Sequence, residues 1–243
     1  MGLTEDLRKK ALEIGFVYMG VTRPDKLRGL PHGKVWNLYE LHSPEEEVPD
    51  VKSVILLGYY VWDRAFNIQV DSLASPSKEV GRPENYQLYY EVLKNKAWTI
   101  VDYLNKRGFE STWTLSIPLK TSAVKCGLGC QGKNTLLITP EYGPRVRLIS
   151  VLTTAELEVD EPFKEDFCRN CQRCVDACPT KALEPYNLTI NRCMTYSAEN
   201  SAATDVSEDV KVLEKKLVPR PTPNSYIECT ICMDACPIGK TKG

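Results

Sequence analysis

The sequence predicts an α/β (α+β) protein in two parts, and three observations lead to this expectation. Residues 1–160 alternate between helical and strand-like hydrophobic patterns, which is typical of a mixed α/β domain. Residues 161–243 hold eight of the ten cysteines, which indicates a small cysteine-rich module. A chain of 243 residues is long enough for one sizeable core plus such a module. We therefore expect two domains, at 1–160 and 161–243.

The first domain begins with a helix and two strands. Residues 4–14 place apolar side chains at near-helical spacing behind Thr4, a plausible helix cap, so they predict an amphipathic helix. Residues 16–21 predict a short strand. Residues 54–58 form a continuous apolar run of strand length. Such runs suit a strand that is buried on both faces, so we expect it in the centre of a sheet.

A long helix and three more strands complete this domain. Residues 71–83 are rich in Ser, Pro and Gly and predict a flexible loop, a candidate lid. Residues 86–106 predict the longest helix, whose apolar face consists of Tyr89, Leu93, Ala97, Ile100, Val101 and Leu104. Further strands are predicted around a glycine-rich turn, at 109–119, 135–139 and 146–153. The polar segment 198–223 contains one more helical pattern.

Composition restricts the functions that we expect. The net charge is -1 and no basic block exceeds a few residues, so we expect no nucleic acid partner. No apolar run reaches the roughly 18 residues of a membrane helix, so we expect no membrane association. No export segment is recognisable, which predicts a cytoplasmic protein. Both histidines, His32 and His42, lie in a loop-rich section, which leaves little material for histidine-based catalysis or metal binding.

The strongest signal is the run from Cys168 to Pro179. Its spacing, C-x2-C-x2-C-x3-C-P, is the one with which bacterial-type ferredoxins hold iron–sulfur clusters. In two-cluster ferredoxins the fourth cysteine of such a run, here Cys178, ligates the other cluster. The sequence therefore predicts a second, partner motif.

The partner motif is the altered run from Cys229 to Pro237. Tyr226 stands where its first cysteine is expected, and Cys193 is the cysteine that can supply the missing ligand from a distance. One [4Fe–4S] cluster is predicted at Cys168, Cys171, Cys174 and Cys236. The other is predicted at Cys178, Cys193, Cys229 and Cys232. Structural zinc is the alternative, because C-x2-C pairs also suit tetrahedral zinc, but zinc needs neither the third cysteine nor the prolines.

A glycine-rich stretch ahead of the cysteines suggests more than a ferredoxin. Glycines permit positive φ and a close approach of the backbone, so a bound ligand is expected near this stretch. The candidate ligand-binding residues are Gly127, Gly129, Gly132, Lys133, Asn134 and Gly143. Cys126 and Cys130 flank the first of these glycines, and both readings stay open for them: buried free thiols, or a redox, ligand or substrate role.

Several motifs together resemble the family of cobalamin-dependent iron–sulfur reductases that includes epoxyqueuosine reductase and the reductive dehalogenases. These are the segments 7–16 and 51–58, the GLGxxGKN turn at 127–134, Thr-Pro-Glu-Tyr-Gly at 139–143, and both cysteine runs. The resemblance implies a nitroreductase-like α/β domain holding base-off cobalamin and a ferredoxin-like module with two [4Fe–4S] clusters. A base-off corrin needs no histidine below the metal, and the low histidine content agrees with that.

The chain also departs from this family at two places. The tRNA-modifying members carry an acidic residue shortly before the proline equivalent to Pro118, whereas residues 114–117 here are Thr-Leu-Ser-Ile. The dehalogenases carry arginine where this chain has Lys133. The substrate therefore stays open between dehalogenation and deoxygenation.

We expect a reductase that passes electrons from a low-potential ferredoxin or flavodoxin through both clusters to a corrinoid and a small organic substrate. Lys133 is the candidate electrostatic group at the cofactor, and the candidate proton donors are Tyr86, Tyr89 and Tyr90. The alternative is a non-enzymatic electron-transfer or activator protein that reduces a partner corrinoid protein. A flavin in the first domain is a third option.

Overall fold

The structure is a computed structural model. It describes residues 2–29, 34–35, 39–61, 68–71, 85–200, 203–223 and 225–239. His32 and nearly all of the predicted loop 71–83 lie outside the described residues.

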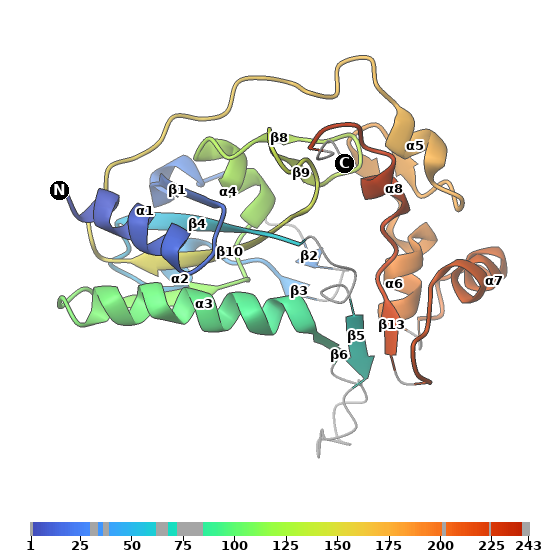
Figure 1. The fold of residues 1–243 in the computed structure, drawn as a ribbon, viewed down its shortest axis with the longest axis horizontal. Helices are drawn as coiled ribbons and strands as arrows, with labels where there is room; N and C mark the ends of the chain where they lie inside the picture. Colours follow the sequence, from blue (N-terminus) through green and yellow to red (C-terminus); the bar gives the residue numbers. More distant parts are fainter. Residues whose placement is uncertain are drawn as a thin grey trace.

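The described helices and strands follow one another as in Figure 1. The α-helices are α1 (Leu3–Glu13), α2 (Pro44–Glu47), α3 (Leu88–Asn105), α4 (Leu119–Lys125), α5 (Arg173–Ala177), α6 (Met194–Glu199), α7 (Glu208–Leu217) and α8 (Ile231–Asp234). The strands up to the glycine-rich stretch are β1 (Tyr18–Thr22), β2 (Lys34–Val35), β3 (Tyr39–Glu40), β4 (Ser53–Tyr60), β5 (Ile68–Asp71), β6 (Asn85–Gln87) and β7 (Ser111–Thr114). The later strands are β8 (Cys130–Gln131), β9 (Leu137–Ile138), β10 (Val146–Thr153), β11 (Leu183–Glu184), β12 (Asn187–Leu188) and β13 (Ser225–Ile227).

The first part is built on a four-stranded antiparallel sheet of order β1-β4-β10-β7. Ile55 and Leu57 of β4 pack with α1 and α3 in one core cluster, whereas Val54 and Leu56 pack with α4 in another. Because successive strand residues point to opposite faces, a strand covered on both sides must be apolar throughout. The prediction that 54–58 forms a central strand is confirmed.

Several predicted elements differ at their ends, for local reasons. Helix α3 begins at Leu88, not at residue 86, because residues 85–87 pair with β5 as strand β6. Its predicted apolar face is confirmed, since all six of those side chains are buried. The predicted strand 109–119 ends at Thr114, and Pro118, which has no N–H for a strand ladder, caps α4 instead.

The predicted cap of the first helix is wrong. Helix α1 has Gly2 at its N-cap position, without a side-chain hydrogen bond. Thr4 is buried, and its hydroxyl accepts a hydrogen bond from the backbone N–H of Glu158 at 2.9 Å. Thr4 therefore ties the helix to the segment that follows the sheet, a long-range contact that a local pattern does not reveal.

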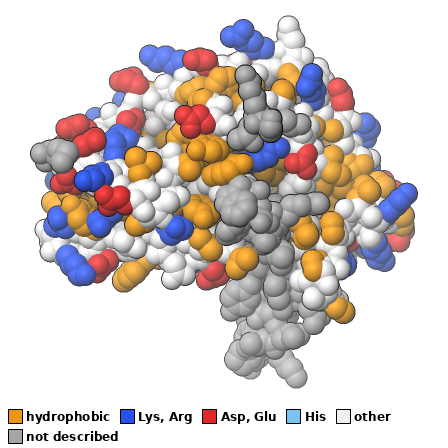
Figure 2. Space-filling model, in the orientation of Figure 1, with side chains coloured by type: hydrophobic (Ala, Val, Ile, Leu, Met, Phe, Trp, Pro, Cys, Tyr) orange, Lys and Arg blue, Asp and Glu red, His pale blue; other side chains and the backbone are white. Residues whose placement is uncertain are grey.

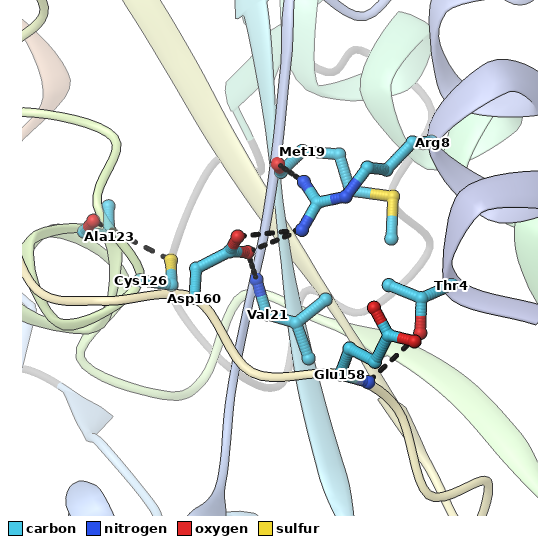
Figure 3. A network of polar contacts seen from close by, with 8 residues as sticks. All are labelled: Thr4, Arg8, Met19, Val21, Ala123, Cys126, Glu158 and Asp160. Carbon is cyan, nitrogen blue, oxygen red and sulfur yellow. Dashed lines mark hydrogen bonds and ion pairs between the residues drawn. The ribbon is translucent and has the colours of Figure 1, made fainter. Parts of the chain in front are cut away.

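The segment after β10 runs along the whole α/β part before it reaches α5 (Figure 1). Figure 3 shows how it is anchored: Arg8 forms an ion pair with Asp160 at 2.7 Å and also donates to the Met19 carbonyl. The carboxylate of Asp160 also accepts from the backbone N–H of Val21 at 2.8 Å. The start of the cysteine-rich part is thus fixed to α1 and β1.

The two parts share a second sheet, of order β13-β5-β6. Strand β13 comes from the cysteine-rich part and pairs with β5 of the α/β part, Tyr226 lying opposite Gln69. The cysteine-rich part is therefore integrated into the first part by strand pairing. In the part of the chain that the structure describes, no helix is long and apolar enough to cross a membrane.

Candidate iron–sulfur and cofactor site

The four thiols predicted for the first cluster line one cavity. Its lining consists of Asn134, Ile138, Phe167, Cys168, Cys171, Cys174, Cys236, Pro237 and Ile238. The apolar side chains come from the glycine-rich stretch, from the linker and from the C-terminal end, so three distant segments build one pocket. The cavity has about 330 Å³ of space, including its open mouth.

Asn134 gives this cavity a polar feature that suits a sulfide cluster. Its side chain is buried, and among the described residues its Nδ2 has no hydrogen-bond partner. The backbone N–H of Lys133 donates to the Cys168 Sγ at 3.5 Å. Since N–H groups that point at cluster sulfurs are a general means of tuning iron–sulfur sites, both residues fit a [4Fe–4S] group here.

The second set of thiols also comes together. Cys178, Cys193 and Cys232 belong to one apolar cluster with Ala182 and Leu183. Cys229 packs against the neighbouring cluster of Met194 and Tyr226. Burial is the main cause that raises its pKa to about 11, and Cys193 and Cys178 raise it further. Burial likewise raises the pKa of Cys232, and Cys229 is the second cause that raises it. Buried thiols of this kind become good thiolate ligands only where a bound metal offsets the cost of the charge.

The two sets interleave along the chain, as the fourth cysteine of a ferredoxin run requires. Cys178 leaves the first run and joins the second set, while Cys236 leaves the second run and lines the first cavity. Among the described residues, no three Cys, His, Asp or Glu side chains are arranged to hold one metal ion. Ligation of the clusters by these eight cysteines stays a prediction.

Tyr226, at the position of the absent cysteine, is a core residue. Its side chain is buried with Met194, Ala198 and Val218, and the guanidinium of Arg220 lies 5.5 Å from its ring centroid. The ring fills the core beneath Cys229, which belongs to the same cluster. A ligand for the second set must therefore come from elsewhere, and Cys193 lies in the right place.

The glycines of the predicted ligand cradle pack against the protein itself. A Cβ on Gly127 would lie 2.7 Å from the Glu161 carbonyl oxygen, and one on Gly129 would lie 2.2 Å from that of Ile138. A Cβ on Gly132 would meet the side chain of Ile138 at 2.6 Å. The close backbone approach that these glycines predict is real, but its partner is the chain's own backbone and core. Their contact with a cofactor stays a prediction.

Gly143 makes the tightest of these approaches. Its φ is +56°, and a Cβ there would lie 2.0 Å from the carbonyl oxygen of Ile238. Conversely, a Cβ on Gly239 would lie 2.1 Å from the Gly143 backbone nitrogen. This glycine pair joins the turn before β10 to the segment that follows Cys236.

Lys133 lies beside the first set of thiols. Its side chain is buried, and its Nζ donates to the Arg169 carbonyl oxygen at 2.6 Å. Arg169 has a φ of +30°, an unusual backbone conformation that this hydrogen bond supports. Lys133 thus holds the loop that carries Cys168, and an additional role at a cofactor stays a prediction.

Tyr89 and Tyr90 belong to a buried polar cluster that crosses between the two parts. The Tyr89 hydroxyl donates to Glu228 at 3.3 Å, and Arg147 forms an ion pair with the same carboxylate. Burial raises the pKa of both tyrosines, and that of Tyr89 well above its ordinary value. Each hydroxyl therefore keeps its proton at neutral pH, but the Tyr89 hydroxyl already donates its hydrogen bond to Glu228. The side chain of Tyr86 lies outside what the structure describes.

The charged partners in this region, among them Glu228 and Arg147, carry no motif in the sequence. Glu228 directly precedes Cys229, and its place beside a predicted ligand was an available signal. Lys120, in α4, is exposed, and its Nζ donates to the Thr135 carbonyl oxygen at 3.0 Å. Desolvation lowers its pKa, and the positive charge of Arg147 lowers it further. Of these residues, Arg147 reaches the second set of thiols, because its partner Glu228 is bonded to Cys229.

Residues 114–117 contain no acidic residue, but an acidic residue from another helix contacts this segment. Glu47 of α2 accepts a hydrogen bond from the Thr114 hydroxyl at 2.8 Å. His42, the histidine that the structure describes, has its Nδ1 at 3.9 Å from the same carboxylate oxygen, and its backbone N–H donates to the Ser116 carbonyl. A carboxylate therefore contacts this segment although the segment contains none.

Cys126 and Cys130 are both buried, in different surroundings. Cys126 lies in the core under α4, where its thiol donates to the Ala123 carbonyl at 3.5 Å (Figure 3). Burial raises the pKa of both thiols, so neither is a reactive thiolate at neutral pH. Cys130 packs with Ile138 and Cys236 next to the first cavity.

The face of the molecule in Figure 2 carries acidic and basic side chains interspersed, with hydrophobic side chains between them. This agrees with the net charge of -1. The view shows no broad field of one sign, so long-range attraction contributes little on this side.

Residues 167–239 match the family of 4Fe-4S double cluster binding domains. The expectation of an α/β fold followed by a C-terminal two-cluster module is thereby confirmed, and so is the iron–sulfur character of the cysteine-rich part.

Two relatives in sequence are epoxyqueuosine reductases. That of Atelocyanobacterium thalassa (isolate ALOHA) is 29% identical over 99% of this chain and 81% of its own length. That of Bacillus subtilis (strain 168) is 27% identical over 99% of this chain and 64% of its own length.

Solved structures give the same picture for the fold. The Bacillus subtilis epoxyqueuosine reductase, in a form whose catalytic aspartate loop is swung out of the active site, has a TM-score of 0.72 at 24% identity. The similarity covers 99% of this chain but 66% of the Bacillus subtilis protein. This chain therefore spans slightly less than two thirds of that protein's length. A catabolic reductive dehalogenase is similar in fold, with a TM-score of 0.58 at 16% identity. This similarity covers 79% of this chain and 28% of the dehalogenase chain. The predicted resemblance to this family is confirmed.

The expectation that nucleic acid plays no part is wrong. One similar structure is that of an epoxyqueuosine reductase solved with an epoxyqueuosine-modified tRNA stem loop. Its TM-score is 0.73 at 22% identity, and the similarity covers 99% of this chain and 66% of that one. Net charge measures long-range attraction, whereas proteins recognise RNA loops through local contacts to unstacked bases. A charge of -1 was therefore no ground for excluding an RNA substrate.

Proposed function

We propose that this chain, a relative of the epoxyqueuosine reductases and structurally of the reductive dehalogenases, is an iron–sulfur oxidoreductase that uses cobalamin to deoxygenate an epoxyqueuosine-type nucleoside in tRNA. The observation that carries the proposal is the pair of interleaved thiol sets, built into a fold that matches those relatives over nearly the whole chain. A low-potential donor would supply the electrons.

The α/β part, which we propose is of nitroreductase-like type, would hold the corrin next to the second set of thiols. Lys120 and Tyr90 are the side chains that we assign to its border. The charge of Arg147 acts on the pKa of both, and the Tyr90 ring lies 4.4 Å from that of Tyr89, which donates to Glu228 beside Cys229. A corrin bound there would supply a strongly reducing metal centre. Glycines 127, 129 and 143 pack closely against other parts of the chain, and we propose that these contacts support the cofactor region.

Removing the oxygen of an epoxide takes two electrons and two protons, and it leaves an alkene and water. The clusters would deliver the electrons, and this chain must supply the protons at the departing oxygen. Glu47 is the group that we propose as proton donor, since it contacts the segment where the tRNA-modifying members carry an acid. Tyr89 is less suited because its hydroxyl proton is held by Glu228.

Cobalamin binding tests the cofactor. Anaerobically purified protein with both clusters intact is expected to bind cobalamin stoichiometrically in equilibrium dialysis and to give a base-off cobalt spectrum. Lys120→Ala is expected to weaken binding without loss of iron, because the lysine would act as a point charge at the cofactor rim. The matched control is Lys125→Ala, at the end of the same helix. If no cobalamin binds while both clusters are present, the proposed enzyme reading fails.

A further inference from the structure

We propose that the buried ion pair between Arg147 and Glu228 sets the reduction potential of the cluster predicted at Cys178, Cys193, Cys229 and Cys232. In this role the pair positions charge and does not itself take part in chemistry. The inference rests on the clusters of the proposed function, but neither on cobalamin nor on the tRNA substrate.

The pair is removed from solvent. The side chain of Arg147, on β10, is 18% exposed, and that of Glu228 is 8% exposed. Tyr89 contacts both partners. Its hydroxyl donates to the carboxylate oxygen that Arg147 does not contact, and its ring centroid lies 4.4 Å from the guanidinium carbon. Three segments far apart in the sequence thus fix one carboxylate in one orientation.

The position of the pair in the chain brings its charges close to the second set of thiols. Glu228 is bonded directly to Cys229, and α8, which carries Cys232, begins two residues later. Arg145 approaches the same helix, with its NH2 at 3.4 Å from Asp234. The α/β part thus meets the cluster-binding segment with two arginines.

Charges at such a place act strongly on a redox centre. A cluster gains one negative charge when it is reduced, and in a poorly solvated environment nearby charges are weakly screened. The carboxylate disfavours reduction and the guanidinium favours it. Together they nearly cancel, so the pair is a neutral dipole whose halves have opposite effects.

Glu228→Gln separates the two effects with little change in shape. The single carbonyl oxygen of the glutamine can still accept from Arg147, and its amide N–H can donate to the Tyr89 hydroxyl oxygen. The guanidinium charge, however, is no longer balanced. We expect the midpoint potential of the second cluster to rise in an EPR-monitored redox titration of the full chain. The first cluster is the internal control, and its midpoint is expected to stay where it is.

The double variant Glu228→Gln/Arg147→Gln is expected to return the midpoint toward that of the unaltered protein. Asp160→Asn provides a second control, because it breaks an arginine–carboxylate pair that is more exposed and lies in the linker (Figure 3). It is expected to lower the free energy of unfolding and leave both midpoints unchanged.

Iron analysis of each variant separates this inference from the proposed clusters. An unshifted second midpoint in Glu228→Gln with full iron content overturns the inference, and so does an equal shift of both clusters. If Glu228→Gln loses iron, the double variant decides: retained iron and a midpoint near the original support charge balance, whereas loss of iron in both means that the pair is structural and overturns the inference. Protein that lacks iron before any substitution contradicts the proposed function instead.

Discussion

Replacing Cys193 by alanine is expected to remove one cluster and about half of the iron, while the other cluster persists. Cys193 lies far from both cysteine runs in the sequence, yet it packs with Cys178 and Cys232 in the structure. Without its thiolate, one iron of the second cluster has no ligand, and Tyr226 is buried in the core and cannot replace it. Iron and sulfide analysis of anaerobically purified protein, together with its EPR spectrum, measures the loss.

The other two cysteines provide the controls. Cys126→Ala and Cys130→Ala are expected to keep the full iron content, because the eight other cysteines are predicted to complete both clusters. Full iron and unchanged spectra in Cys193→Ala would show that the remote ligand is assigned wrongly. A loss of iron in Cys130→Ala, whose thiol lies beside the first cavity, would point to the same error in the other set.

Gly143→Ala is expected to produce the largest loss of stability among single glycine substitutions, more than about 3 kcal/mol. The new Cβ would lie 2.0 Å from the carbonyl oxygen of Ile238, and this neighbour is backbone that cannot rotate away. Ile238 and Pro237 also line the first cavity, so the displacement would reach the predicted cluster. Denaturant unfolding and iron content measure the two consequences.

Gly108→Ala is the matched control for the backbone conformation. Its φ is +85°, but a Cβ there meets nothing within 4 Å. We expect it to cost only the strain of a left-handed conformation, about 1–2 kcal/mol. If Gly143→Ala is no more destabilising than Gly108→Ala, the tight contact between the turn and the C-terminal segment is not a main support of the fold.

Local sequence patterns correctly predicted the helices and strands whose buried and exposed residues alternate regularly or form one apolar run. The apolar run at 54–58 became the central strand β4, and the strand predicted at 146–153 became β10 with the same bounds. The periodic face of α3 matches its buried residues. In each case burial on a sheet or beneath a helix leaves a repeating signature in the sequence.

Contacts between distant segments left no such signature. Strand β13 pairs with β5, and Glu228 pairs with Arg147, across separations that no local window spans. The glycines show the same limit: the sequence indicated a close approach, but only the structure shows that the partner is the chain's own backbone. The thiol sets were predictable because the spacing of ferredoxin runs itself encodes an exchange of ligands.

Conversion of an epoxyqueuosine-containing tRNA stem loop is the measurement that tests the proposed function most directly. Protein loaded with both clusters and cobalamin, and reduced by a low-potential donor, is expected to yield a nucleoside that has lost one oxygen atom, detected by mass spectrometry after digestion. Glu47→Gln is expected to lower the yield at unchanged iron and cobalamin content, because it removes the proposed proton donor. An unchanged nucleoside after incubation with fully loaded and reduced protein would contradict the proposed function.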